Sequence, residues 1–273
     1  MYAKKSLGQH FLRSEKALRT IVEAGNLSPE DIVLEIGPGQ GVLTRRLLEA
    51  GAKVVAVEKD DELFKYLNLE FKEEISNGRL ELVHDDILKF IENCKLKIEN
   101  YKLIANIPYN ITGAVLEKFL SSDTQPSLMV LLVQDEVAKR IVARDKKESI
   151  LSISVKAYGK PRYVERVLAG SFAPTPSVNS AIIAIEAINK DFFTLRPFEG
   201  FNPPAGGFSE KAFFQLLKAG FKSKRKKLSS NLLTICDKEM IAETFQKLGM
   251  DENIRAEDVS LKLWQELATE ILG

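Results

Sequence analysis

The chain has 273 residues, of which 45% are hydrophobic and 28% are charged, and its formal net charge is +1. This length supports one large core, or one core with a small second domain, and no apolar run approaches the roughly 20 residues of a membrane span, which argues against an integral membrane protein. The two cysteines, Cys94 and Cys236, form no CxxC pair, and His10 and His84 lack metal-ligand spacing, so the sequence predicts no disulfide framework, no metal site and a cytoplasmic location.

Apolar runs alternate with helical patterns through the first two thirds of the chain. Near-continuous apolar strands separated by helices are typical of a parallel sheet that is covered on both faces. The predicted strands are 32–36, 53–57, 80–84, 101–105 and 128–133, and the predicted helices lie near 42–50, 61–75, 112–121 and 135–144. A later pair, about 162–171 and 178–186, predicts an antiparallel addition at the sheet edge.

The composition changes after residue 190. Residues 191–208 hold three prolines, three glycines and five phenylalanines, which indicates a linker that packs against the protein. Only helical patterns follow, at 209–220, 225–234, 238–248 and 256–272, with Gly220 and Gly249 at positions typical of helix ends. We therefore expect an α/β catalytic domain over residues 1–188 and a small helical domain over residues 200–273.

Basic residues are concentrated in this second domain. Residues 211–236 carry seven lysines or arginines and no acid, whereas residues 237–273 carry nine acids and four basic residues. Such a run either binds phosphates or is a solvated helix end. The candidate RNA-binding residues are Lys222, Lys224, Arg225, Lys226 and Lys227.

A glycine loop joins the first predicted strand to its helix. Gly37, Gly39 and Gly41 have the spacing G-x-G-x-G, and Val42 and Thr44 stand where the dinucleotide fingerprint would place its last glycine. A loop that approaches an uncharged nucleoside is therefore favoured over a pyrophosphate cradle, with a plain tight turn as the alternative.

Acids end the next two strands. Glu58 follows the second strand, where a carboxylate accepts hydrogen bonds from ribose hydroxyls, and Asp86 follows the third, where it accepts from an adenine amine. Ligands in open α/β sheets bind outside the carboxyl ends of the strands, so both acids are expected beside the glycine loop.

The fourth strand is followed by Asn106-Ile107-Pro108-Tyr109. The lone pair of an aromatic amine is delocalised into the ring, which makes the amine a poor nucleophile. The Asn106 side-chain oxygen and the carbonyl before Pro108 provide two acceptors for its protons, and Tyr109 provides a stacking face. The sequence thus indicates transfer of a methyl group from a nucleoside-type donor to an exocyclic amine.

With these motifs in this order, the chain resembles the ribosomal small-subunit RNA adenine N6,N6-dimethyltransferase family over almost its whole length. Four further segments are similar to family motifs, including the F-x-P-x-P-x-V pattern. They are 6–12 (SLGQHFL), 134–140 (QDEVAKR), 172–178 (FAPTPSV) and 221–231 (FKSKRKKLSSN).

The resemblance implies a Rossmann-like class I methyltransferase sheet with a small C-terminal helical domain. It implies S-adenosylmethionine as the methyl donor and dimethylation of two adjacent adenines in a hairpin near the 3′ end of small-subunit (16S) rRNA. The implied partners are this rRNA and the assembling small ribosomal subunit, with no membrane, and we expect a monomer. The alternatives are a large-subunit rRNA adenine methyltransferase and a non-catalytic ribosome-assembly factor.

By the same resemblance, Asn106 and the Ile107 carbonyl would hold the target amine, and Tyr109 and Phe172 would sandwich the extruded base as catalytic residues. The donor would be bound by His10, Leu12, Gly37, Gly39, Glu58, Asp86, Ile87 and Asn106.

The chain departs from the family pattern beside the expected base pocket. Ser177 stands where the family usually has a basic residue and Asn179 where it usually has an acid. A usual Tyr-Gly pair is replaced by Ser149-Ile150. Because these positions are expected beside the target base, contacts with the substrate are where this chain is expected to differ most from the family.

Overall fold

The computed structural model describes residues 9–92, 98–194 and 208–273. Cys94, residues 6–8 of the N-terminal motif and most of the predicted linker lie outside this part of the chain. The chain forms two compact units, Met1–Ala138 with Lys160–Ile188, and Lys139–Gly159 with Asn189–Gly273. The sequence prediction kept residues 139–159 with the α/β domain, whereas their packing groups them with the C-terminal helices. No helix among the described residues is long and apolar enough to cross a membrane.

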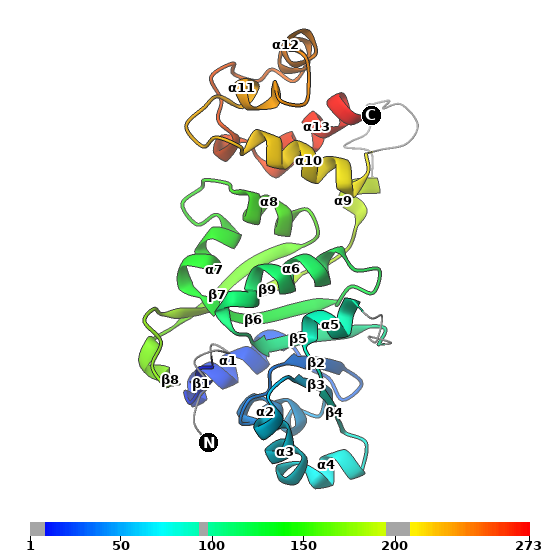
Figure 1. Ribbon diagram of the computed structural model, residues 1–273, viewed down its shortest axis with the longest axis vertical. Helices are drawn as coiled ribbons and strands as arrows, with labels where there is room; N and C mark the ends of the chain where they lie inside the picture. The colour runs from blue at the N-terminus through cyan, green and yellow to red at the C-terminus, as the bar shows by residue number, and fades with distance from the viewer. Residues whose placement is uncertain (1–8, 93–97, 195–207) are drawn as a thin grey trace. The chain divides into compact units, whose positions relative to one another are not determined.

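The first unit contains a seven-stranded sheet in the order β4-β3-β2-β5-β6-β9-β7 (Figure 1). The pairs among β4, β3, β2, β5 and β6 are parallel, and β9 pairs antiparallel with both β6 and β7. The predicted parallel sheet and its antiparallel addition are confirmed. The strands are β2 (Ile32–Ile36), β3 (Lys53–Glu58), β4 (Leu80–His84), β5 (Tyr101–Asn106), β6 (Leu128–Gln134), β7 (Lys160–Val167) and β9 (Ser180–Glu186).

Helices connect the strands of this unit. The single helix predicted over 61–75 is two helices, because the chain leaves the helical region at Phe71 (φ −110°), whose ring is fully buried. The helices α1 and α5 were not predicted. The helical elements are α1 (Glu15–Gly25), α2 (Val42–Glu49), α3 (Asp61–Glu70), α4 (Lys72–Ser76), α5 (Ile87–Glu92), η2 (Tyr109–Ile111) and α6 (Thr112–Ser121), and α7 (Asp135–Val142) contains the division between the units.

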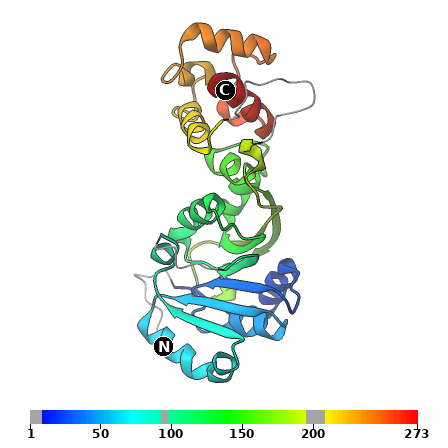
Figure 2. The same ribbon diagram turned by 90° about the vertical axis from the view of Figure 1, so that its right-hand side faces the viewer.

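The main core lies on one face of the sheet. Alternate strand residues such as Val33, Val54 and Ile104 pack with Leu18 of α1 and Leu47 of α2, all of them almost completely buried. Burial of this kind contributes about 25 cal/mol per Å² of apolar surface and positions the strand ends. Figure 2 shows α1, in blue, and α6, in green, on opposite sides of the sheet.

A separate two-stranded ribbon joins distant parts of the sequence. In it β1 (Phe11–Leu12) pairs antiparallel with β8 (Phe172–Ala173), which follows η3 (Ala169–Ser171). The register places Phe11 opposite Ala173 and Leu12 opposite Phe172. The ribbon was not predicted, since two-residue strands leave no periodic pattern.

The second unit is helical. Phe213, Leu216 and Trp264 are fully buried in its core. Two predicted helices are shorter than expected: the one over 225–234 is α11, and the one over 256–272 starts with a 3₁₀ turn. The elements are α8 (Ile150–Lys156), α9 (Asp191–Thr194), α10 (Glu210–Gly220), α11 (Leu228–Leu232), α12 (Lys238–Lys247), η4 (Ala256–Asp258) and α13 (Leu261–Leu272).

Candidate active site

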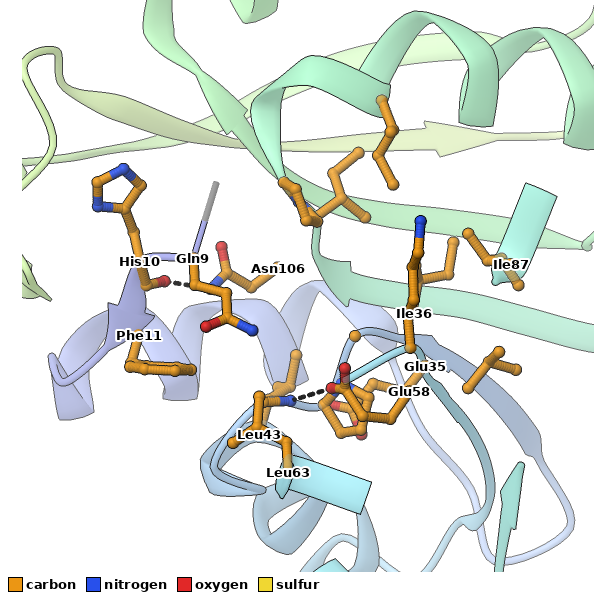
Figure 3. Close-up of a pocket in the computed structure, with 18 of the residues that line it drawn as sticks. Gln9, His10, Phe11, Glu35, Ile36, Leu43, Glu58, Leu63, Ile87 and Asn106 are labelled. Carbon is orange, nitrogen blue, oxygen red and sulfur yellow. Dashed lines mark hydrogen bonds between the residues drawn. The ribbon is translucent and has the colours of Figure 1, made fainter. Parts of the chain in front are cut away.

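A cavity of about 220 Å³ opens at the carboxyl ends of β2, β3 and β5 in the first unit. Glu35, Glu58 and Ile87 lie toward one side of it, and His10 and Asn106 toward the other (Figure 3). All the predicted donor and target-amine residues line this cavity except Phe172. Those that line it are His10, Leu12, Gly37, Gly39, Glu58, Asp86, Ile87, Asn106 and Tyr109.

The glycine loop adopts the left-handed backbone that its sequence predicts. Gly37, Gly39 and Gly41 have φ values of 63°, 60° and 75°, a region that residues with a Cβ rarely occupy. A Cβ on Gly41 would lie 2.4 Å from a ring carbon of Phe71, whereas a Cβ on Gly37 would meet nothing within 4 Å. The loop therefore requires glycine for its conformation throughout, and at Gly41 for packing as well.

Glu58 is tied to the glycine loop by its carboxylate. The Gly39 N–H donates to Oε2 at 3.1 Å and the Asp60 N–H donates to Oε1 at 2.8 Å. Burial raises the pKa of Glu58, and these two hydrogen bonds partly offset the rise. The Lys59 backbone N–H also contacts this carboxyl group, and a carboxylate has about four lone-pair sites, so Glu58 still has acceptor capacity for a ligand hydroxyl.

Asp86 is held by two donors. Its Oδ2 accepts from Lys59 Nζ at 2.8 Å, and its Oδ1 accepts from the Leu88 N–H at 3.0 Å. Partial burial raises the pKa of Asp86, but the contacts with Lys59 and Leu88 outweigh it, and the net pKa lies below the ordinary value. Asp86 is therefore an anion that is aligned to accept a further hydrogen bond.

Glu35 is a third carboxyl in the cavity wall, and it is 1% exposed. Burial raises its pKa to about 8, against a hydrogen bond from the Thr44 hydroxyl at 2.6 Å and with a further contribution from the negative charge of Glu58. Below pH 8 the side chain is therefore predominantly protonated.

Asn106 is oriented by the N-terminal segment. Its Nδ2 donates to the backbone carbonyl of His10 at 3.3 Å (Figure 3). The amide nitrogen is thereby assigned to this contact, and Oδ1 stays available as an acceptor. The structure thus joins a residue at the end of β5 to one that lies 96 positions earlier.

Tyr109 is held at two places. Its hydroxyl lies 2.7 Å from Oγ of Ser180, and its ring is stacked with that of His10 at a centroid distance of 5.9 Å and an angle of 22°. His10 in turn contacts the Pro174 carbonyl through Nδ1 at 2.8 Å. Burial raises the pKa of Tyr109, so the phenol is protonated at neutral pH.

Phe172 has a different environment. It is 4% exposed and belongs to the main core, beside Leu12 in the β1–β8 ribbon. It does not line the cavity, although the ribbon places its backbone next to residues that do. The sandwich of the base between Tyr109 and Phe172 therefore stays a prediction, and it requires a movement of this side chain.

Two of the departures from the family pattern, Asn179 and Ser149, have local structural roles. The Asn179 side-chain oxygen accepts from the Ala169 N–H at 2.9 Å, a role that an acid would also fill. Ser149 caps α8 through a reciprocal pair of hydrogen bonds with Ser152. Asn179 and Ser149 thus each hold the local backbone of this chain.

The basic run lies between α10 and α11 in the second unit. Buried Asn231 fixes this segment, because its Nδ2 donates to the carbonyls of Gly220 at 2.7 Å and Ser223 at 3.1 Å. The ring of Phe221, at the start of this segment, stacks on Trp264. Within the described residues no acid pairs with the exposed cations, which are Lys222, Lys224, Arg225, Lys226 and Lys227.

Four residues of the site were not singled out from the sequence. Glu35 is the first residue of the 35–41 glycine motif but was given no role, and Lys59 follows Glu58, so the proximity of both to the ends of β2 and β3 was a usable signal. Gln9 lines the cavity beside His10, and its place in the 6–12 motif was a usable signal. Ser180 gave no signal, because its contact with Tyr109 spans 71 positions.

The cavity fits S-adenosylmethionine by the chemistry of its lining. The carboxyl oxygens of Glu58 and Asp86 are acceptors that suit ribose hydroxyls and an adenine amine, and the left-handed glycine loop leaves room for close approach of a ligand. Ile87 and Leu12 supply apolar surface. The described residues contain no group of three or more His, Cys, Asp or Glu side chains that could hold a metal ion.

Comparison with known proteins identifies relatives along the full length of the chain. The family model described as ribosomal RNA adenine dimethylase matches residues 1–272. A protein of Dehalococcoides mccartyi named ribosomal RNA small subunit methyltransferase A is 41% identical over 275 residues, covering 99% of this chain and 89% of the relative. A protein of the same name from Lactobacillus johnsonii is 37% identical, covering 98% and 90%.

Solved structures share the fold. A dimethyladenosine transferase from Plasmodium falciparum superposes with a TM-score of 0.77 at 25% identity, covering 94% of this chain and 96% of that one. The 23S rRNA methyltransferase ErmE has a TM-score of 0.72 at 23% identity, covering 96% and 99%. The predicted class I methyltransferase fold is thereby confirmed.

Proposed function

The chain belongs to the ribosomal RNA adenine dimethylase family, and from this membership we propose its reaction. It is an S-adenosylmethionine-dependent methyltransferase that dimethylates N6 of adenine in small-subunit rRNA. We propose further that its targets are two adjacent adenines in a hairpin near the 3′ end, and that it acts as a cytoplasmic monomer on the assembling subunit.

One observation carries this proposal: the residues expected to bind the methyl donor and those expected to bind the target amine line the same cavity. Glu58 is the last residue of β3, and Asp86 lies two residues after β4. Asn106 is the last residue of β5, and Tyr109 follows it. A donor on the two acids and an amine at Asn106 would therefore share one enclosed space. Alignment of reacting groups in this way contributes up to about 7–11 kcal/mol to catalysis.

In this proposal the donor is held by side chains that are already in place. Glu58 accepts the ribose hydroxyls, Asp86 accepts the adenine amine, and Gly37 and Gly39 admit the amino-acid part. When bound, S-adenosylmethionine supplies an electrophilic methyl group on a sulfonium. Glu58→Ala should weaken donor binding by about 1.5–3 kcal/mol, the range for a hydrogen bond to a charged group, and calorimetry measures this directly.

The chain's own contribution at the acceptor is to hold the amine. The Asn106 Oδ1 accepts one amine proton, because Nδ2 is engaged by His10, and the Ile107 carbonyl accepts the other. These contacts localise the lone pair on N6 and direct it at the methyl group. The methylated amine then loses a proton to water, so no side chain has to act as a general base.

The RNA would be held mainly outside the cavity. We propose that the five exposed cations between α10 and α11 contact phosphates, which position the RNA without reading its sequence. Contacts of Asn231 and Trp264 hold the loop that carries these cations. They support this role, because an ordered loop loses less entropy when it binds RNA.

The experiment that tests the proposal maps methylated adenines. The protein is incubated with labelled donor and either unmethylated small-subunit particles or large-subunit rRNA, with Asn106→Ala as the impaired control. Dimethyladenine in the small-subunit RNA alone is the expected result. Label in large-subunit RNA would instead identify the protein as a large-subunit rRNA adenine methyltransferase. Binding to the particles without any label would indicate a non-catalytic assembly factor.

A further inference from the structure

The hydroxyl of Tyr109 points to a residue with no assigned role. Ser180 is the first residue of β9, its exposure is 0%, and its Oγ lies 2.7 Å from the Tyr109 oxygen. The backbone of Ser180 is fixed on both sides, because it pairs with Gln134 of β6 and Val167 of β7. The Tyr109 hydroxyl is therefore in contact with a strand residue that pairs on both sides within the sheet.

The hydroxyl and the ring of Tyr109 have different surroundings. The hydroxyl contacts a buried serine, which leaves the ring as the part of Tyr109 that is offered to a ligand in the cavity. The neighbouring His10 ring contacts Tyr109 as well, and Nδ1 of His10 is engaged with the Pro174 carbonyl. The orientation of the Tyr109 ring is thus set by two contacts. Ser180 holds its hydroxyl, and the His10 ring stacks with it.

We infer that Ser180 is a positioning residue that sets the Tyr109 ring to receive the target adenine. This inference rests on the proposed function. The hydroxyl of Tyr109 takes no part in proton transfer, and its use is to fix the plane on which the base stacks. Stacking in the correct plane directs the adenine amine at Asn106, so an error in the ring angle lowers the rate at saturating substrate.

The test uses a double-mutant cycle with Ser180→Ala, Tyr109→Phe and the double variant. Single-turnover methyl transfer is measured with saturating donor and RNA. Each single variant should be slower by about 10-fold, the scale of one lost hydrogen bond with a partner left unsatisfied. The double variant should be slowed by about the same factor, because both single changes remove the same contact.

A spectroscopic readout separates positioning from general damage. In RNA that carries 2-aminopurine at the target position, emission should be quenched by the ring in the wild type and should rise in Ser180→Ala, while donor affinity is unchanged. Tyr101→Phe is the matched control, because it removes a tyrosine hydroxyl that donates to the Thr124 carbonyl at 3.0 Å, away from the cavity. It should leave emission and rate unchanged.

Two results would overturn the inference. The first is a wild-type rate in either single variant, and the second is multiplication of the two losses in the double variant, which would mean independent roles. Failure of the proposed function looks different, because the wild-type protein itself would then transfer no methyl group to small-subunit RNA.

Discussion

Replacement of Glu35 by glutamine should change how stability depends on pH. The wild-type carboxyl is buried and its pKa is raised to about 8 from an ordinary value of 4.5. The folded state therefore keeps a proton that the unfolded chain releases, and this stabilises the fold fully below pH 4.5. The contribution decreases as pH rises and is lost as pH passes through about 8. Glutamine is neutral at every pH and keeps an acceptor for the Thr44 hydroxyl.

The size of the effect follows from the pKa values. One carboxyl that binds a proton only in the folded state changes the free energy of unfolding by about 1.4 kcal/mol per pH unit. Between pH 6 and pH 8 the ionisation of Glu35 should therefore lower the free energy of unfolding of the wild type by about 2 kcal/mol. The raised pKa of Glu58 acts in the same direction, but it is present in both proteins and drops out of the comparison.

Urea denaturation at pH 6, 7 and 8 without ligand measures this difference. The unfolding free energy of Glu35→Gln should increase relative to that of the wild type by about 2 kcal/mol across this range. If the two proteins lose stability in parallel, the carboxyl does not take up a proton on folding, and the reasoning from its burial is wrong.

Three further results are expected. Asn106→Ala should slow single-turnover transfer by about 10²–10³, the scale for one lost preorganised contact, with RNA affinity almost unchanged. Replacing Lys224 and Arg225 by alanine should weaken RNA binding regardless of sequence and lower the salt slope by about one per lost phosphate contact. Gly41→Ala should cost about 1–3 kcal/mol more in urea denaturation than Gly37→Ala, because both strain the backbone but only the first clashes.

Each of these results has a contrary outcome. A folded Asn106→Ala protein with near wild-type rate would leave that residue a merely structural part of the turn. An unchanged salt slope would make the basic loop a solvated surface. Alanine substitution of exposed Lys238 and Arg255 in the same unit is the charge-matched control, because it also removes one lysine and one arginine. Equal stability of the two glycine variants would mean that Phe71 yields to the added methyl group without cost.

The parts of the molecule that could be predicted from sequence are those with local signals. The strands over 32–36 and 80–84 agree with β2 and β4 to the residue, because each is a short segment of mainly aliphatic residues between clear breaks. The glycine loop and the acids after β3 and β4 were located because parallel strands place their carboxyl ends at one edge. Their convergence on a single cavity is a consequence of the strand order.

The parts that could not be predicted depend on distant contacts. Ser180 and the His10 carbonyl reach Tyr109 and Asn106 across 71 and 96 positions, and although each lies in or beside a motif, the motif does not say which distant residue it contacts. Helix α8 was missed because its seven residues include two serines, and its cap is Ser149, which was noted only as a departure from a pattern. Phe172 was interpreted from its motif, and its burial depends on a two-residue pairing with β1.

The β1–β8 ribbon also sets an order of events during synthesis. Leu12 is made early, but its partner Phe172 leaves the ribosome 160 residues later. The glycine loop, Glu58 and Asp86 are all translated before that point, so the floor of the cavity is available to fold while its N-terminal cover still lacks a partner. A nascent chain that stops short of β8 therefore cannot form this wall of the cavity, and the β1–β8 contact that completes the wall is one of long contact order, a kind that forms slowly.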